Sequence, residues 1–294
     1  MLLSLPKDSM LIASTALSFY KNYVSGAIPV NLTEAVKSML LNPTLLPSLE
    51  RVIKGILNAQ KEVTISLQLP REELNKQEAL SYLSLSEFAY SQVGAPQGWT
   101  RLSKDSIGGI LLHNTATGFD AEIFQNQQTG EISIAFRGTE NSNDWADNFR
   151  QLSEFSPQLQ QGYQLALAAK ALFGNKVSFT GHSLGGAIAQ VAGLATGLKT
   201  YVFNGNGLND ATLYHIGWDK VQANQNAITS VVYKGEFVSD LDNQQDGDAL
   251  SGGKVQGQVH YVEDPSYFYS RGLVDNAYNR HAIAPLKQAL QNTA

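Results

Sequence analysis

Residues 176–194 read KVSFT-GHSLGG-AIAQVAGL, and this stretch decides the fold. Its first five residues are β-prone and alternate apolar side chains, which is typical of a strand. Small, helix-compatible residues follow from position 187. Between them lies Gly-x-Ser-x-Gly, in which Gly181 and Gly185 leave room for a tight strand-to-helix turn at Ser183. The stretch predicts a nucleophile elbow, with Ser183 in a strained conformation and its hydroxyl facing a substrate.

A serine hydroxyl is a poor nucleophile at neutral pH, so Ser183 needs a base, a group that orients the base, and donors for an oxyanion. The first residues of the predicted helix have backbone N–H groups with no acceptor inside the helix. The N–H of Leu184 is therefore a candidate oxyanion donor.

Composition narrows the class of protein. The chain has 294 residues, 43% hydrophobic and 16% charged, which suits a large α/β domain with an appendage. No segment approaches the ~18 apolar residues of a membrane span. A net charge of −5 without a basic stripe argues against a nucleic-acid partner, and any membrane contact should be hydrophobic. Cysteine is absent, which excludes disulfides and thiolate metal sites.

The N-terminal part differs from the rest. We expect residues 1–75 to form a helical extension or cap and residues 76–294 to form the catalytic domain, because amphipathic patterns occupy 33–41 and 49–57. The extension either packs on the main domain or offers a surface to lipid, a secretion protein or an accessory protein. The apolar run at 10–20 lacks a charged leader and a clear cleavage site. We therefore expect either secretion without a Sec-type signal peptide or a cytoplasmic protein.

Beyond residue 75, helical and strand patterns alternate, which predicts an α/β fold with a mostly parallel central sheet flanked by helices. One pair of strands, 118–125 and 131–136, reads as a hairpin at the sheet edge, with Gly130 in its turn. The expected strands are 110–113, 118–125, 131–136, 176–180, 200–203, 229–233 and 254–262, and the expected helices are 78–91, 158–173, 185–196 and 282–291.

The search for the base is short, because folds with such an elbow place the serine first, then the acid, then the histidine. Three histidines follow Ser183. His215 comes too early to follow an acid, and His260 alternates with apolar neighbours in a predicted strand, so both are interpreted as structural. His281 lies in a loop-like segment directly before the last helix, and we predict that it is the base.

The acid is expected in the loop after the strand at 229–233, because strand-end loops gather the chemistry of this architecture. Glu236 is the first carboxylate there, and Asp240 is the second candidate. Glu236 is either a solvated loop residue or the group that orients His281 and stabilises its imidazolium form.

Four segments together carry a resemblance to a known family: Gly-His-Ser-Leu-Gly-Gly at 181–186, Ile-Ala-Phe-Arg-Gly-Thr at 134–139, Asp-Trp-Ala-Asp-Asn-Phe at 144–149 and Lys-Gly-Glu-Phe-Val-Ser at 234–239. Over about residues 76–291 the chain resembles the class 3 lipase family of α/β-hydrolases, and within it bacterial phospholipase A1. The resemblance implies the α/β-hydrolase fold and makes Thr139 a second oxyanion donor. Trp145 falls in a segment that often carries a lid or a stabilising tryptophan. Glu236 departs from the family, which usually has Asp there.

The resemblance further implies a serine-dependent carboxylic ester hydrolase that acts on acyl lipids and releases free fatty acid through an acyl-enzyme. Ser183 is the nucleophile, His281 the base and Glu236 the acid, with Leu184 and Thr139 as oxyanion donors. Two alternatives remain: an esterase for soluble aryl or feruloyl esters, and a lipid-binding or partner-binding protein with little turnover.

Three further features of the sequence bear on the site. We expect no cofactor and no metal, because an EF-hand loop begun at Asp242 would have Gly253 where the bidentate glutamate belongs. His182, inside the elbow, is interpreted as a packing or hydrogen-bonding residue. Aromatic residues gather at 261 and 267–269, where they either wall an acyl pocket or pack against the C-terminal helix.

Overall fold

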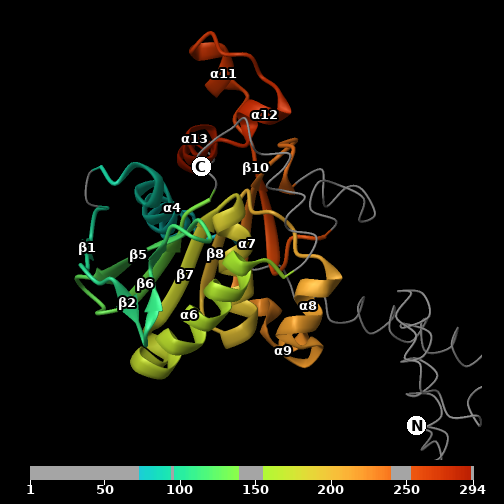
Figure 1. Cartoon of the computed structure of the whole chain (residues 1–294). Coiled ribbons are helices and arrows are strands. Elements are labelled where there is room, and N and C mark those ends of the chain that lie inside the picture. Colours follow the sequence, from blue (N-terminus) through green and yellow to red (C-terminus); the bar gives the residue numbers. More distant parts are fainter. Residues whose placement is uncertain (1–72, 94–95, 139–154, 240–252, 293–294) are drawn as a thin grey trace, which may run out of the picture. The chain divides into compact units, whose positions relative to one another are not determined.

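The computed structural model describes residues 73–93, 96–138, 155–239 and 253–292. They belong to one compact unit, Glu73–Ala294 (Figure 1). The predicted extension at 1–75 lies outside the described residues except for its last three, so the domain boundary stays a prediction.

The central sheet combines an antiparallel edge with a parallel centre. Its strand order is β1-β5-β6-β7-β8-β9-β10, with β4 beside β5. The strands from β6 to β10 pair in parallel, whereas β1, β5 and β6 pair antiparallel. This confirms the predicted α/β class. The bounds are β1 Trp99–Arg101, β4 His113–Asn114, β5 Phe119–Asn126, β6 Ile132–Phe136, β7 Val177–His182, β8 Thr200–Phe203, β9 Ile228–Tyr233 and β10 Gln258–Val262, and a separate ladder joins β2 Ser106–Ile107 to β3 Ile110–Leu111.

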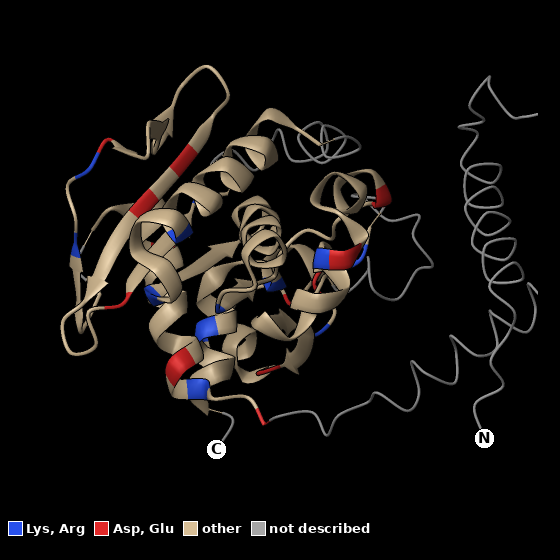
Figure 2. Ribbon diagram, turned by 90° about the horizontal axis from the view of Figure 1, so that it is seen from below, with Lys and Arg blue, Asp and Glu red and all other residues tan. Residues whose placement is uncertain are grey.

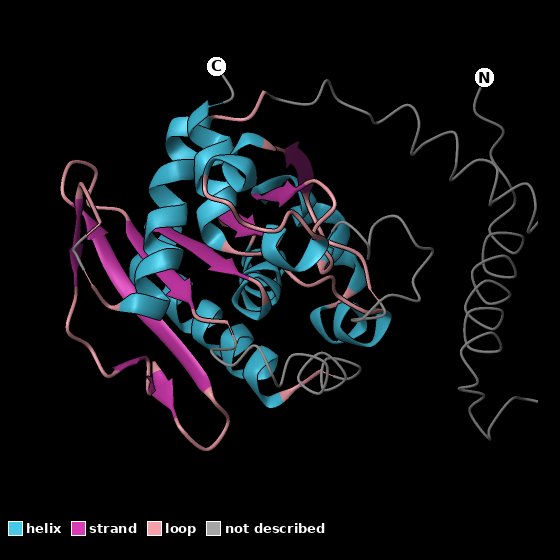
Figure 3. Ribbon diagram, turned by 90° about the horizontal axis from the view of Figure 1, so that it is seen from above, coloured by secondary structure: helices cyan, strands magenta, loops and turns pink. Residues whose placement is uncertain are grey.

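Helices cover both faces of the sheet (Figure 3). Helices α6 and α7 pack together on one face, and α4 and α13 pack together on the other (Figure 1). The bounds are α4 Lys76–Ser91, α6 Pro157–Phe173, α7 Leu184–Thr196, α8 Asp210–Ile216, α9 Trp218–Asn224, α11 Ser266–Ser270, α12 Ala277–Arg280 and α13 Ile283–Asn292, and two 3-10 turns are Gly174–Lys176 and Gln225–Ala227. Among the described helices, none combines the length and apolarity needed to span a bilayer.

The pleat of the strands divides the core in two, because successive side chains point to opposite faces. Ile134 and Phe136 join the cluster under α6 and α7, whereas Ala135 between them joins the cluster under α4 and α13. Strands β6 to β9 contain no Asp, Glu, Lys or Arg, and the charged residues lie on outer elements (Figure 2). The parallel centre is therefore uncharged and largely apolar on both faces, as buried parallel sheets are.

Three details of the predicted sheet were wrong. The hairpin of β5 and β6 is not at the edge, because β1 pairs with the outer side of β5. The strand expected at 110–113 is two short strands interrupted at the buried Leu112. Strand β10 begins at Gln258 and not at 254, because Gly257 takes a φ of 87°, outside the extended region.

Candidate active site

The predicted elbow joins the end of β7 to the start of α7. Ser183 has φ 59° and ψ −127°, a strained conformation for a residue with a side chain. A Cβ on Gly181 would lie 2.1 Å from the Gly185 carbonyl oxygen, and a Cβ on Gly185 would lie 2.2 Å from that of Phe136. Neither position therefore has room for a side chain, which is the reason the sequence needs glycine on both sides of the serine.

The structure brings the three predicted side chains together. His281 Nε2 lies 2.9 Å from Ser183 Oγ, and His281 Nδ1 lies 2.5 Å from Glu236 Oε2. Since an ionised carboxylate only accepts, Nδ1–H donates to Glu236, and Nε2 of the neutral ring accepts from the serine hydroxyl. All three residues are buried, with Glu236 and His281 at 0% exposure. A continuous hydrogen-bond chain therefore runs from Glu236 to Ser183 at the carboxyl end of the sheet.

Backbone donors fix the Glu236 carboxylate. The N–H of Val238 donates to Oε2 at 3.0 Å, and the N–H of Ser239 donates to Oε1. The Ser239 hydroxyl in turn donates to the Gly205 carbonyl, in the loop that follows β8, at 2.8 Å. The loop after β9 thus wraps around its own carboxylate, which holds Oε2 toward the imidazole.

The backbone of His281 is held from two sides. Asn204, directly after β8, donates from Nδ2 to the His281 carbonyl at 3.0 Å and accepts from the N–H of Tyr233 at 2.8 Å. The neighbouring Arg280 forms a two-point ion pair with Asp275, with N–O distances of 2.7 and 3.0 Å. The segment before His281 is the short helix α12 and not the predicted loop, and this helix leads directly into His281.

His182 and Tyr90 connect the elbow to the His281 backbone. His182 Nε2 lies 2.8 Å from the His281 carbonyl oxygen, so Nε2 carries the proton. The Tyr90 hydroxyl lies 3.1 Å from both Nδ1 and the carbonyl oxygen of His182 and donates to this pair of acceptors, and it accepts the N–H of Gly138 at 3.1 Å. Burial, reinforced by the nearby His281, lowers the pKa of His182 to about 3. The hydrogen-bonding interpretation of His182 is confirmed, whereas the roles of Tyr90 and Asn204 were not predicted from the sequence.

Of the two predicted oxyanion donors, the structure describes Leu184 but not Thr139. Leu184 is the first residue of α7, so its N–H has no acceptor inside the helix. Thr139 lies outside the described residues, as do Asp240, Trp145 and the acidic cluster at 240–248. Its neighbour Gly138 lies against the serine, because a Cβ built there would be 3.3 Å from Ser183 Cβ. The chain therefore enters the Thr139 segment beside Ser183.

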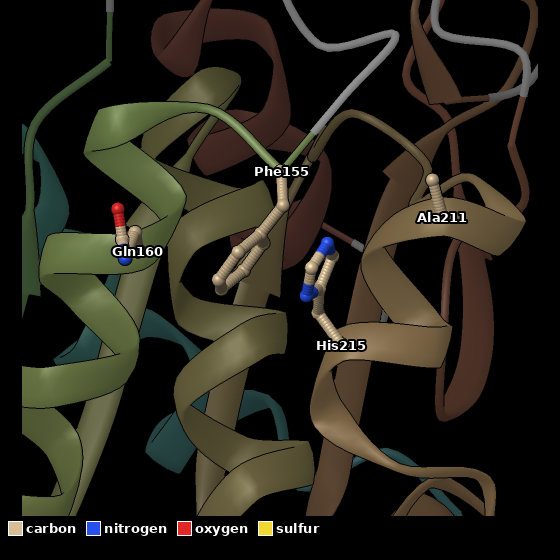
Figure 4. A pocket seen from close by; sticks show the side chains of 4 residues that line it. All are labelled: Phe155, Gln160, Ala211 and His215. Carbon is tan, nitrogen blue, oxygen red and sulfur yellow. The ribbon is translucent and has the colours of Figure 1, made fainter.

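A pocket of about 340 Å³ lies between α6 and α8 and shares no lining residue with these groups (Figure 4). It is lined by Phe155, Gln160, Ala211 and His215, and the rings of Phe155 and His215 stack at 5.0 Å. His215 therefore belongs to helix α8 and not to the hydrogen-bond chain, and His260 lies in β10 as predicted. In the described ranges, no group of three or more His, Asp or Glu residues could hold a metal.

A mostly parallel sheet, helices on both faces and a serine raised on a strand-to-helix elbow define an α/β-hydrolase fold. The chain belongs to the family described as phospholipase-like, with a Tle-like phospholipase domain. The model of that family matches residues 81–277, about two thirds of the chain.

The chain is also similar to individual proteins. The chain is 36% identical over 155 residues to an extracellular phospholipase A1 of Serratia liquefaciens, an alignment that covers 51% of this chain and 48% of the relative. The match thus spans about half the length of that relative. Solved structures include a Penicillium expansum triacylglycerol lipase, at 16% identity over 64% of this chain and 79% of that one, with a TM-score of 0.45. A Rhizomucor miehei lipase in complex with its propeptide matches at 17% identity over 66% and 71%, with a TM-score of 0.46.

Proposed function

We propose that this chain is a serine-dependent carboxylic ester hydrolase that acts on acyl lipids, as a phospholipase A1 or a lipase, and releases free fatty acid. The observation that carries the proposal is the buried hydrogen-bond chain from Glu236 through His281 to Ser183, with distances of 2.5 and 2.9 Å. Such a chain activates a hydroxyl that is otherwise a poor nucleophile. Membership in the phospholipase-like family supports the same reaction class.

In the first half of the reaction, Ser183 Oγ attacks the ester carbonyl carbon while His281 Nε2 takes the hydroxyl proton. The imidazolium that forms is stabilised by Glu236, whose Oε2 already accepts Nδ1–H. The carbonyl oxygen becomes an oxyanion and receives the N–H of Leu184, with Thr139 as the second donor. His281 then protonates the leaving alkoxide, which departs as an alcohol or a lysophospholipid.

In the second half, His281 takes a proton from water, and the resulting hydroxide attacks the acyl-enzyme carbonyl. Collapse of the second tetrahedral intermediate breaks the acyl–oxygen bond, and the proton on His281 returns to Ser183 Oγ. Every proton is therefore carried by one ring nitrogen, and the sequence of steps calls for no metal.

The Serratia relative is named an extracellular phospholipase A1, and this supports two finer proposals. The ester that is cleaved is the sn-1 ester of a glycerophospholipid, and the chain works outside the cell. A secretion or accessory protein would then meet the N-terminal region, residues 1–75, which is one of the roles left open for that region by its sequence.

Product analysis tests the proposed function. The full chain is incubated with mixed phospholipids and triacylglycerols that carry different acyl groups at sn-1 and sn-2, and products are identified by mass spectrometry. We expect free fatty acid from sn-1 and 2-acyl lysophospholipid, and neither from Ser183→Ala. Fatty acid released from triacylglycerol alone would identify a lipase, and hydrolysis confined to soluble aryl esters would contradict the acyl-lipid assignment.

A further inference from the structure

Four exposed apolar side chains lie within the ten residues 269–278, which run from the end of α11 into α12. Tyr269 is 78% exposed, Val274 67%, Leu273 48% and Tyr278 47%. We call these four residues the apolar tip. Helices α11 and α12 and the chain between them stand beyond the end of the sheet, at the top of the molecule in Figure 1. The tip thus projects beyond the end of the sheet.

The tip is held in place from below. The N–H of Leu273 donates to the Phe268 carbonyl at 2.9 Å, and Asn279 Nδ2 donates to the Val274 carbonyl at 2.7 Å. Phe268 itself is buried and packs edge-on against Tyr233. The aromatic cluster of the sequence analysis therefore divides, with Phe268 in the core near α13 and Tyr269 pointing to solvent. The Leu273 N–H thus connects the backbone of the tip to a core residue, while the four apolar side chains of the tip stay exposed.

Two ring contacts link the tip to the proposed base. Tyr278 stacks on Phe237 with ring centroids 5.7 Å apart and an interplanar angle of 15°. Phe237 in turn meets His281 edge-on at 5.3 Å. The apolar tip and the hydrogen-bond chain of Ser183 therefore lie at the same end of the sheet, and a surface that covers Tyr278 would bring its molecules beside the reacting groups.

The charges around the tip are nearly balanced. The Arg271 guanidinium lies 4.3 Å above the centre of the Tyr267 ring, and Asp275 is paired with Arg280. Two arginines and one aspartate leave this surface with only a weak basic field. Tyrosine combines an apolar ring with a polar hydroxyl, which suits the boundary between lipid headgroups and acyl chains. The chemistry fits an uncharged, deformable apolar surface.

We propose that the apolar tip inserts into the surface of a zwitterionic phospholipid bilayer and seats the chain with the Ser183 site toward the acyl esters. This inference rests on the proposed function, since an acyl-lipid hydrolase must reach its substrate in an aggregate. Balanced charge predicts weak dependence on salt, because the contact is hydrophobic. Leu273 and Val274, at the turn between the helices, enter deepest.

The test compares two double variants of the full chain in the Ser183→Ala background, which leaves vesicles intact. The tip variant is Leu273→Ser with Val274→Ser, and the matched control is Leu167→Ser with Leu172→Ser on α6, whose side chains are 38% and 60% exposed. Binding is measured by co-sedimentation with phosphatidylcholine vesicles. We expect the tip variant to bind roughly 10- to 100-fold more weakly and the control to bind like the parent, because only the tip loses inserted apolar area.

The same pairs with Ser183 intact are assayed on phosphatidylcholine vesicles and on a short-chain ester kept below its aggregation concentration. We expect the ratio of vesicle rate to soluble-ester rate to fall at least about tenfold for the tip variant, in step with the loss of binding. Equal vesicle binding by the folded tip variant and its parent overturns the inference, and so does a self-association that the tip variant alone abolishes. If the intact chain cleaves no ester yet vesicle binding still depends on the tip, the proposed function fails and the tip inference stands.

Discussion

Replacement of Glu236 by glutamine tests the hydrogen-bond chain at its buried end. The carboxylate accepts from His281 Nδ1 and Val238 through Oε2 and from Ser239 through Oε1. Glutamine supplies one acceptor oxygen and one NH2 group in the same volume. In either orientation, at least one of these N–H donors faces another donor in a site with 0% exposure. Each unsatisfied buried donor costs about 1–3 kcal/mol of unfolding free energy.

The catalytic cost follows from the imidazole. If the glutamine NH2 group faces Nδ1, the ring shifts its proton to Nε2 and can no longer accept from Ser183. If the oxygen faces Nδ1, the tautomer is kept but the charge that stabilises imidazolium is gone. We expect kcat to fall about 10³- to 10⁴-fold, which is about 4–5.5 kcal/mol of transition-state stabilisation.

The assay is hydrolysis of a soluble short-chain ester, with folding checked by circular dichroism. The matched control is Glu122→Gln, since Glu122 is also buried but pairs with Arg101 on the antiparallel edge, at 2.7 Å through both oxygens. That variant should lose stability and keep its kcat. The reasoning is refuted if folded Glu236→Gln retains kcat within tenfold of the parent, or if both variants lose activity equally.

Three further predictions concern the elbow and its supports. Tyr90→Phe leaves the Gly138 N–H and His182 Nδ1 without their shared hydroxyl, so the free energy of unfolding measured in urea should fall by about 1–3 kcal/mol. An unchanged free energy of unfolding would contradict this network. The pKa of His182 is 6.5 in the unfolded chain and about 3 in the folded protein. Between these two pH values only the unfolded state binds the proton, so the free energy of unfolding should fall by about 4–5 kcal/mol as the pH drops from 6.5 to 3. His182→Gln should remove that component from the acid dependence of unfolding, and an identical pH profile argues against it. Gly185→Ala should prevent soluble folding, because its Cβ would meet the Phe136 carbonyl oxygen at 2.2 Å. A Cβ at Gly130 meets no atom within 4 Å, so Gly130→Ala should lower the free energy of unfolding by only about 1 kcal/mol through its positive φ. Equal yields of the two soluble proteins would contradict this.

The part of the site that the sequence predicted is the part encoded locally. The elbow needs a strand, two glycines and a helix within about twenty residues, and each has its own signature in 176–194. His281 and Glu236 followed from chain order and from the position of strand ends. The structure places both within hydrogen-bond reach of the next group in the chain.

The missed residues depend on tertiary packing. Tyr90 lies at the end of α4, 92 residues before His182, and meets it only because α4 packs across β7. Asn204 lies in a loop and has a φ of 42°, a conformation that hydrophobic periodicity does not predict. The error at β10 has the same origin, since one left-handed glycine inside an apparently continuous strand pattern sets where pairing begins. Local patterns predict elements, whereas the contacts between elements decide which polar groups support the site.

Covalent labelling with a fluorophosphonate measures directly whether His281 makes the Ser183 hydroxyl the nucleophile. We expect one adduct per chain, located on Ser183 by peptide mass spectrometry, with labelling at least about 10³-fold slower in His281→Ala. An adduct on another serine, or an equal labelling rate in the two proteins, would contradict it.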